Sequence, residues 1–579
     1  MSFIAPVNPR AYRADHSYGP MNAERATLHA PSFSSSLGNP KEAQGPMRES
    51  LGSNGAARVG WASVSLLLAL MACGEEEPPP ITVPDGAAWG DIFLEPCTYE
   101  VPAASYEAEC GTFVVPENRS DPDSRLIVLP VTRVPATGSE PAEPLFYLEG
   151  GPGVSNTYFS RLERLVERHD IVLVGYRGID GSVVLDCPEI TQAFENMPDD
   201  LLSAASLTTI ADAYARCGER LHDEGVDTDG YTMMEVVDDM EEARIALGYE
   251  RIHLLSESYG TRLALIYAWR YPQSIHRSVM IGVNPPGHFV WNPDVIDRQL
   301  EYYSELCDRD LECRSRTDDL AETMREVARN MPARWLVFPI KRDNVLAGTF
   351  MLLYHTATAR AIFDTWLAAA DGDYSGFALL SKTIDLMLPN ASVWGESAAK
   401  ATSADYAIEP GRDYVAEMSP PHSIIGSPAS ALGWGAAAGW PSKLIPGEYR
   451  QVQPSDVETL LISGSVDFST PAEAATEELL PHLTNGHQVI LREFGHTGDV
   501  WTLQPEATKQ LLVSYFDTGT VDESLFAYQP MDFHVGLGLP DIAKLIVIGF
   551  VVSVLVVAVV MWLVYRLIRK RRKKKPVIL

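Results

Sequence analysis

A serine with small neighbours stands between a short apolar run and an amphipathic segment. The run Arg251–Ser256 predicts a buried strand, and residues 261–271 predict a helix that ends at Pro272. Between them lies Ser256-Glu-Ser258-Tyr-Gly260. A nucleophile at a sharp strand-to-helix turn needs small residues two positions before and after it, because the backbone is strained there and a larger side chain would strike a neighbouring strand. We therefore expect Ser258 to be a nucleophile. Serine at position 256 replaces the usual glycine, and the alternative is a chance surface serine.

Two residues further along the chain are suited to activate this hydroxyl. A serine is a weak nucleophile unless a base accepts its proton and an acid orients that base. Asp467 follows the apolar run 458–463 and enters a loop, and His496 follows the run 487–492 between glycines. Only His496 among the 13 histidines follows a terminal core strand after a loop acid. We predict a Ser258, Asp467, His496 triad; the alternatives are a structural histidine and a surface aspartate.

A glycine-rich turn upstream supplies a third element. Leu148-Glu-Gly-Gly-Pro-Gly153 follows a predicted strand. Glycines at that place let a backbone N–H approach an oxygen that gains negative charge during acyl transfer. We expect the amides of Gly151 and Tyr259 to form this oxyanion hole, the alternative being a turn without a catalytic role.

The elements that must position these residues alternate between strands and helices, which predicts a mostly parallel central sheet flanked by helices. This α/β core is expected in residues 96–283 and 450–520, after a spacer at 74–95. Residues 284–449 lose the alternation and predict an inserted, mainly helical cap. The expected strands are 125–134, 145–148, 171–174, 251–256, 278–282, 458–463 and 487–492, and the expected helices are 232–247, 261–271, 318–330, 358–370 and 472–480.

Seven cysteines are an awkward number for an oxidised protein until Cys73 is given a separate role. It ends an apolar run after Arg58, and Leu70-Met-Ala-Cys73 resembles a bacterial lipobox, in which the cysteine is lipidated. We expect a signal peptide at 47–73 after a disordered or mis-started stretch at 1–46; the alternative is an uncleaved signal-anchor. The other six allow 15 connectivities, of which we favour pairing between sequence neighbours in an oxidising compartment. These pairs are Cys97 with Cys110, Cys187 with Cys217, and Cys307 with Cys313.

The C-terminal region predicts a membrane anchor. Residues 545–565 carry no charge over a length that spans a bilayer as a helix. Eight basic residues follow within 566–575 of the tail 566–579, and basic flanks stay on the cytoplasmic side. We therefore expect a protein of the cytoplasmic membrane whose remaining chain faces the periplasm or cell surface. The formal charge is −31 with the eight basic residues of this tail included, so the chain before residue 566 carries −39, and so acidic a surface makes nucleic acid an improbable partner.

Further motifs accompany the residues above: Gly150-Gly-Pro-Gly153, Tyr176-Arg-Gly178 before Asp180-Gly-Ser182, Ser258-Tyr-Gly-Thr-Arg262 and Tyr271-Pro272. From about Pro96 to Asp517 the chain resembles the proline iminopeptidase and tripeptidyl aminopeptidase branch of the α/β-hydrolases. Two positions depart from it: Glu149 stands where iminopeptidase relatives carry histidine, and Gly175-Tyr176 replaces an acidic-glutamine pair. The cysteine pairs 187/217 and 307/313 also look like those of secreted relatives.

The resemblance implies a serine peptidase that releases proline or short peptides from free N-termini through an acyl-enzyme, with acidic cap residues holding the substrate ammonium. Four cap residues fit that last role equally well, the alternative being that they are plain surface residues: Glu396, Asp405, Glu409 and Asp413. No metal or other cofactor is expected. An esterase or lactonase on the same triad and a non-catalytic binding ectodomain are the alternatives, and the oligomeric state stays open.

Overall fold

The computed structural model describes residues 81–102, 104–197, 199–409 and 411–572. The predicted N-terminal stretch 1–46, signal peptide 47–73, lipidation site Cys73 and the end of the basic tail lie outside the described residues.

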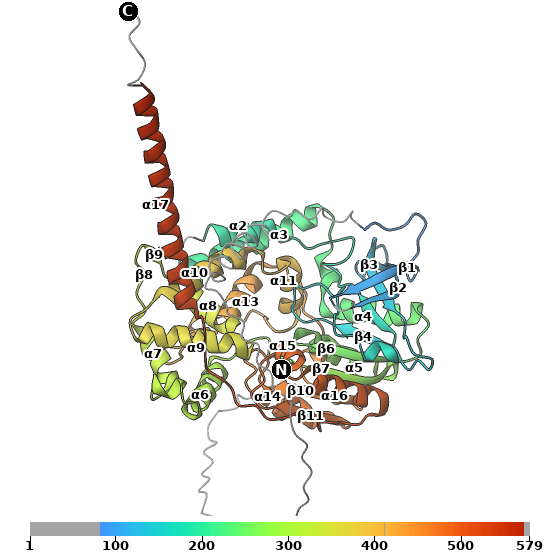
Figure 1. The fold of residues 1–579 in the computed structure, drawn as a ribbon. Helices are drawn as coiled ribbons and strands as arrows, with labels where there is room; N and C mark the ends of the chain where they lie inside the picture. The colour runs from blue at the N-terminus through green and yellow to red at the C-terminus, as the bar shows by residue number, and fades with distance from the viewer. Residues whose placement is uncertain (1–80, 103, 198, 410, 573–579) are drawn as a thin grey trace, which may run out of the picture. The chain divides into compact units, whose positions relative to one another are not determined.

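A nine-stranded sheet forms the centre of the described chain (Figure 1), in the order β1-β2-β3-β5-β4-β6-β7-β10-β11. The first three strands run antiparallel to their neighbours, and the six from β5 to β11 are parallel. Their bounds are β1 Ile92–Val101, β2 Ala104–Pro116, β3 Leu126–Val134, β4 Leu145–Leu148, β5 Ile171–Val174, β6 Ile252–Glu257, β7 Ile275–Ile281, β10 Glu458–Gly464 and β11 Gly486–Leu491.

The parallel strands are short apolar runs because helices cover both faces of the sheet. Along β6, Leu254 packs with α4 and α5 on one face, whereas Leu255 belongs to the cluster that includes α16 on the other. Side chains of successive residues in a strand point to opposite faces, so one short strand contributes to both layers. The helices of this core are α4 Met233–Ala246, α5 Tyr259–Arg270, α14 Ala472–Ala474, α15 Thr497–Thr502 and α16 Pro505–Thr518.

A mainly helical region separates β7 from β10, with one two-stranded hairpin in it. Two helices that precede β6 along the chain, α2 and α3, pack against its members α11 and α13. The helical layer therefore draws on residues before 284 as well as on the predicted insertion. Its elements are α2 Pro188–Glu195, α3 Ala204–Asp223, α6 Pro293–Arg309, α7 Leu320–Arg329, β8 Arg334–Trp335, β9 Phe338–Pro339, α8 Arg342–Leu352, α9 Thr356–Ala370, α10 Ser375–Met387, α11 Trp394–Ala404, α12 Tyr414–Met418 and α13 Pro428–Gly439.

Two local expectations need correction. The strand β1 begins at Ile92, inside the range 74–95 predicted as a spacer, because it pairs along its whole length with β2. The single helix predicted at 472–480 is instead a short α14 followed by irregular helical turns, since Pro481 interrupts its end.

Three disulfides join the neighbour pairs that the sequence favours. They are Cys97–Cys110, Cys187–Cys217 and Cys307–Cys313, with Cα–Cα distances of 5.8, 5.5 and 5.1 Å. The first joins β1 to β2, the second joins the start of α2 to α3, and the third closes the turn after α6.

The last helix, α17 (Leu539–Arg572), leaves the helical layer as a long rod (Figure 1). It is the one helix among the described residues that is long and apolar enough to cross a membrane. Its first turn packs on α10, where Ser375 Oγ donates to the Pro540 carbonyl at 3.1 Å and Lys544 pairs with Asp373 at 3.0 Å.

Candidate active site

Ser258 occupies a strained turn between β6 and α5. Its φ of +50° and ψ of −123° lie in a region that non-glycine residues rarely adopt. The turn is fixed by the Ser258 N–H, which donates to the Ile281 carbonyl at 2.8 Å, and by Thr261, whose hydroxyl donates to the Ser258 carbonyl at 2.6 Å. Ser258 is half-buried, so its hydroxyl stays accessible at the end of the sheet. Such strain persists where the surrounding structure enforces it, which fits a nucleophile elbow.

Close backbone approaches explain the glycines around this turn. A Cβ on Gly260 would lie 2.3 Å from the Leu148 carbonyl oxygen, and one on Gly150 would lie 3.0 Å from Ser258 Cβ. The small Ser256 is buried, and its hydroxyl donates to the Val279 carbonyl at 3.1 Å. The glycine loop after β4 therefore lies directly against the serine.

Asp467 and His496 form a buried pair beyond β10 and β11. The His496 Nδ1 lies 2.8 Å from Asp467 Oδ2. The other carboxylate oxygen of Asp467 accepts the N–H groups of Ser469 and Thr470 at 2.9 and 2.8 Å. With Oδ2 also accepting the Thr470 hydroxyl at 2.7 Å, the carboxylate is fixed in one orientation.

Burial acts to lower the pKa of His496, and the nearby Asp467 carboxylate outweighs it, so that the net pKa is raised. The loop is also held by the helical layer, because the His496 N–H donates to the Tyr354 carbonyl at 2.6 Å. Gly282 (φ +65°) packs below the imidazole; a Cβ there would lie 2.9 Å from His496 Cε1. Ser258 and His496 line the same cavity. Within the described chain, no hydrogen bond directly joins their side chains, a bond that commonly tightens only with substrate bound.

The glycine loop beside Ser258 contains backbone amides with and without partners. Gly151 has a φ of +110°, a backbone conformation that only glycine adopts without strain. Its neighbours have partners: the Gly150 N–H donates to Glu149 Oε1 at 2.7 Å, and the Gly153 N–H donates to Glu396 Oε2 at 2.6 Å. Among the described residues, no protein acceptor is recorded for the amides of Gly151 or Tyr259. These are the two donors that the sequence predicted for an oxyanion.

Two carboxyl groups flank the Ser258 turn and share one hydroxyl. The Tyr147 hydroxyl lies 2.8 Å from Glu149 Oε2 and 3.0 Å from Glu257 Oε1, which also accepts the Trp501 indole N–H at 2.9 Å. Burial, with a further contribution from the Glu149 charge, raises the pKa of Glu257 to about 7. One hydroxyl hydrogen cannot serve two carboxylates, so a protonated Glu257 relieves both the charge repulsion and the missing donor.

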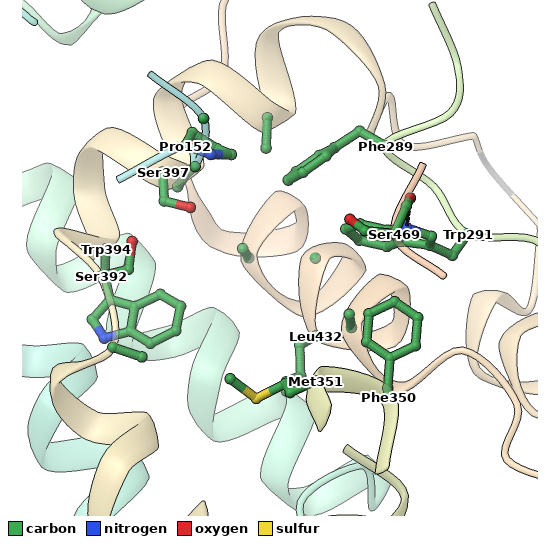
Figure 2. Close-up of a pocket in the computed structure, with 18 of the residues that line it drawn as sticks. Pro152, Phe289, Trp291, Phe350, Met351, Ser392, Trp394, Ser397, Leu432 and Ser469 are labelled. Atoms are coloured by element: carbon green, nitrogen blue, oxygen red, sulfur yellow. Dashed lines mark hydrogen bonds between the residues drawn. The ribbon is translucent and has the colours of Figure 1, made fainter. Parts of the chain in front are cut away.

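The cavity beside Ser258 has a volume of about 470 Å³. Figure 2 shows Phe289, Trp291 and Phe350 on one side of it and Trp394 on the other. Its walls come from the loops after β4, β6 and β11 and from helices of the cap, mainly α3, α8, α11 and α13. In the described part of the chain, Glu149 is the one carboxylate that lines it.

The four acidic cap residues named from sequence lie elsewhere. Glu396 is buried, bonds to the Gly153 N–H and pairs with Lys400. Asp405 is half-buried, with its side chain covered, and accepts the Gly287 N–H at 2.8 Å. Asp413 caps α12, and Glu409 is exposed. None of the four contributes to the described wall of this cavity. The presence of acidic residues in the cap sequence is therefore no guide to substrate contacts.

The departure at Gly175-Tyr176 has a structural counterpart. Tyr176 is buried, its hydroxyl donates to the Glu149 carbonyl at 3.0 Å, and the Lys400 ammonium lies 4.0 Å from its ring centre. A Cβ on Gly175 would meet Asp180 and Pro130 at 2.6 Å. Tyr176 thus supports the glycine loop from below. Sequence reasoning missed this role of Tyr176 and the roles of Tyr147, Glu257 and Glu396. Of these, Glu257 alone had a signal in the sequence, because it is a glutamate at the end of an apolar strand.

The described geometry agrees with a comparison at the family level. Residues 143–496, more than half of the chain, match the alpha/beta hydrolase fold family. The chain belongs to this family.

Similarity to individual proteins supports a hydrolase and leaves the kind of hydrolase open. The chain is 28% identical over 212 residues to the tripeptidyl aminopeptidase of Streptomyces lividans, covering 34% of this chain and 39% of that protein. It is 28% identical over 206 residues to serine protease Hip1 of Mycobacterium tuberculosis, covering 33% and 38%. It is 26% identical over 159 residues to the proline iminopeptidase of Lactobacillus delbrueckii subsp. lactis, covering 28% and 42%. Each alignment thus spans about two fifths of the relative, and the shared property is that of a hydrolase.

Proposed function

We propose that this chain is a serine peptidase that cleaves short peptides behind a free N-terminus, with Ser258, His496 and Asp467 as its triad. The observation that carries the proposal is one cavity whose wall contains Ser258, His496 and Glu149 together. Relatives named tripeptidyl aminopeptidase and proline iminopeptidase support a peptide substrate.

In the proposed reaction Ser258 Oγ attacks the scissile carbonyl carbon while His496 takes the hydroxyl proton. The amides of Gly151 and Tyr259 donate to the oxyanion that forms. His496 then passes the proton to the leaving nitrogen, the C–N bond breaks, and the acyl-enzyme remains. Water, deprotonated by His496, attacks this ester and releases the carboxylate product and free Ser258. Asp467 holds the proton on Nδ1, so that Nε2 serves as the base, and stabilises the imidazolium.

Glu149 is our candidate for the substrate ammonium. It is half-buried and lies at the catalytic end of the cavity, one residue before the glycine loop. Its oxygens already accept from Gly150 and Tyr147, yet each carboxylate oxygen has a further lone pair for a charged donor. An ammonium bound here would also offset the charge repulsion between Glu149 and Glu257.

We further propose that the catalytic region works outside the cytoplasm, attached to the cytoplasmic membrane by α17. Three disulfides favour an oxidising compartment. The eight basic residues in 566–575 favour a cytoplasmic tail. Lipidation of Cys73 would add a second attachment, and a Cys73→Ser variant that still takes up labelled lipid in a bacterial host would contradict it.

The test uses full-length protein in nanodiscs and chromogenic amides of alanine, proline and a tripeptide, each with a free and an N-acetylated amine. We expect turnover of the free-amine amides, at least a tenfold loss of kcat/KM on acetylation, and none in Ser258→Ala. Glu149→Gln should raise KM for free-amine substrates and leave acetylated ones unchanged. Turnover that survives in a correctly folded Ser258→Ala would refute the nucleophile.

An esterase acting on apolar acyl groups is the second candidate, and the apolar, aromatic lining of the cavity favours it. Short-chain nitrophenyl esters in the same assay distinguish the two. Fast ester turnover with inert amides would move the protein to this class and retain the triad.

A further inference from the structure

The hairpin of β8 and β9 exposes apolar side chains at its tip. Arg334 pairs with Pro339 and Trp335 with Phe338, which leaves Leu336 and Val337 as a two-residue turn. Leu336 is 64% exposed, Val337 84% and Phe338 42%. Three consecutive large apolar residues therefore face outward from the cap.

This turn has the wrong residues for a hairpin in water. Two-residue turns favour Asn, Asp and Gly, which adopt positive φ with little strain and hydrogen-bond to water. Leu336 instead has a φ of +52°. The Trp335 and Phe338 rings stack beneath it with centroids 5.9 Å apart, so the hairpin is held by its aromatic pair while Leu336 and Val337 at the tip stay exposed. An apolar tip of this kind points to an apolar environment outside the described chain.

The hairpin stands beside the membrane helix. α10 packs against both strands and also against the start of α17. The chain leaving β9 is tied to the same helix, because Lys341 pairs with Asp385 at 2.8 Å. In Figure 1 the hairpin lies next to α17 where that helix leaves the cap. The end of α10 adds Leu386 and Met387, 66% and 61% exposed, to the apolar surface.

Basic residues surround the tip. Residues 329–342 contain four basic side chains, Arg329, Arg334, Lys341 and Arg342, and no acidic one, in a chain with a net charge of −31. Apolar side chains flanked by cations are typical of segments that enter the acyl boundary while their charges reach the phosphates of the headgroups.

We propose that the β8–β9 hairpin inserts Leu336, Val337 and Phe338 into the surface of the phospholipid bilayer that α17 spans. Two observations favour a bilayer as the partner of this tip: the hairpin lies beside α17, and basic residues surround it. Together the hairpin and α17 form two points of attachment, which hold the cap against the membrane in one orientation. This inference rests on the membrane helix and is independent of which bond the enzyme cleaves.

The experiment uses full-length protein in nanodiscs that contain phosphatidylglycerol and phosphatidylcholine, with a photoreactive benzoyl-phenylalanine at one position. Three positions are compared: Val337 at the tip, Val557 within α17, and Ile245 on α4. Ile245 is a matched control because it is also an exposed apolar residue, at 60%. Illumination and mass spectrometry then measure the yield of lipid adducts.

We expect the adduct yield at 337 to lie within a few-fold of that at 557 and at least tenfold above that at 245. The double variant Leu336→Asp/Val337→Asp, with the probe at 338, should lose most of its adduct, whereas adducts at 557 persist. A yield at 337 equal to that at 245 would overturn the proposal. Cross-linking of 337 to a second protein chain in place of lipid would likewise overturn it and assign the tip to a protein interface.

Discussion

The carboxylate of Glu396, on α11 of the cap, accepts a 2.6 Å hydrogen bond from the Gly153 N–H of the glycine loop. Its other oxygen pairs with the buried Lys400, whose ammonium lies over Tyr176. One cap helix is thus tied to the loop that would hold the oxyanion. A buried polar contact therefore joins the glycine loop to the cap, although Gly153 and Glu396 are 243 residues apart in sequence.

Removal of one partner from this buried pair should be costly. We expect Glu396→Ala to lower the free energy of unfolding by roughly 3–5 kcal/mol, because Lys400 is left buried without a counter-charge. Glu396→Ala/Lys400→Met should recover most of that loss, since an apolar pair needs no compensation. Urea denaturation of the wild type and the two variants measures it.

The same double variant separates stability from catalysis. Because Gly153 has lost its acceptor, kcat should remain reduced by roughly five- to tenfold, the value of about one hydrogen bond. Full recovery of kcat along with stability would show that the bond has no positioning role.

Asp467 should set the pH at which His496 works. The pKa of His496 is raised by Asp467 against the effect of burial, so kcat/KM should rise with pH through a value above 6.5. Asp467→Asn should move this limb to lower pH and reduce kcat by roughly 10³–10⁴ through loss of the tautomer. A pH profile on an activated ester measures both.

The raised pKa of His496 also predicts how the stability of the fold changes with pH. A histidine whose pKa is raised by folding stabilises the native state fully below its unfolded pKa and loses that contribution as pH rises through the folded value. The difference in Tm between wild type and Asp467→Asn should therefore shrink between pH 6 and pH 9. A difference that grows over this range would contradict the assignment.

Local patterns were sufficient for much of the parallel half of this fold. The predicted strand 145–148 matches β4, and 458–463 lies within β10, because short apolar runs covered on both faces have a distinct composition. The strands β1 and β2 were not predicted, since their pairing mixes polar and apolar residues at the edge of the sheet. Strands at or next to the edge of a sheet, as β1 and β2 are, carry only a weak hydrophobic pattern.

The residues of the candidate site likewise fall into those that the sequence predicted and those that it did not. Ser258, Asp467 and His496 follow strand ends, and strand ends of a parallel sheet meet at one edge, so sequence order was enough to bring them together. The contact of Glu396 with Gly153 depends on how the cap folds over the sheet. No periodicity reports it, and from sequence Glu396 is equally plausible as a substrate contact and as a plain surface residue.

Gly282 offers a test of the packing around His496. In Gly282→Ala the new Cβ would lie 2.9 Å from His496 Cε1 and carry the strain of φ +65°. We expect a loss of about 1 kcal/mol in stability and at least a tenfold loss in kcat, because the imidazole must shift. Gly248→Ala is the matched control: its φ is +80°, yet a Cβ there meets nothing within 4 Å. It should show a similar stability loss with unchanged kcat, and equal losses of activity in both variants would contradict a specific effect on His496.

The carboxyl pair beside the nucleophile predicts how Glu257→Gln responds to pH. Burial and the Glu149 charge raise the pKa of Glu257 to about 7, from an ordinary value near 4.5. Between these values the native state keeps a proton that the unfolded chain has lost, so stability falls as pH rises and stays constant above pH 7. Glutamine keeps an oxygen that accepts the Trp501 indole N–H and cannot ionise.

Glu257→Gln should therefore match the wild type near pH 4.5 and exceed it at pH 8, by an amount on the order of 3 kcal/mol at most. Thermal unfolding from pH 4.5 to 8.5 measures the difference, with Glu523→Gln as the control because Glu523 is exposed. A difference that is independent of pH would mean that Glu257 stays ionised in the native state. The Tyr147 hydroxyl would then have to satisfy two charged carboxylates with one hydrogen, and the Glu149 side chain would have to turn toward the cavity to relieve the repulsion.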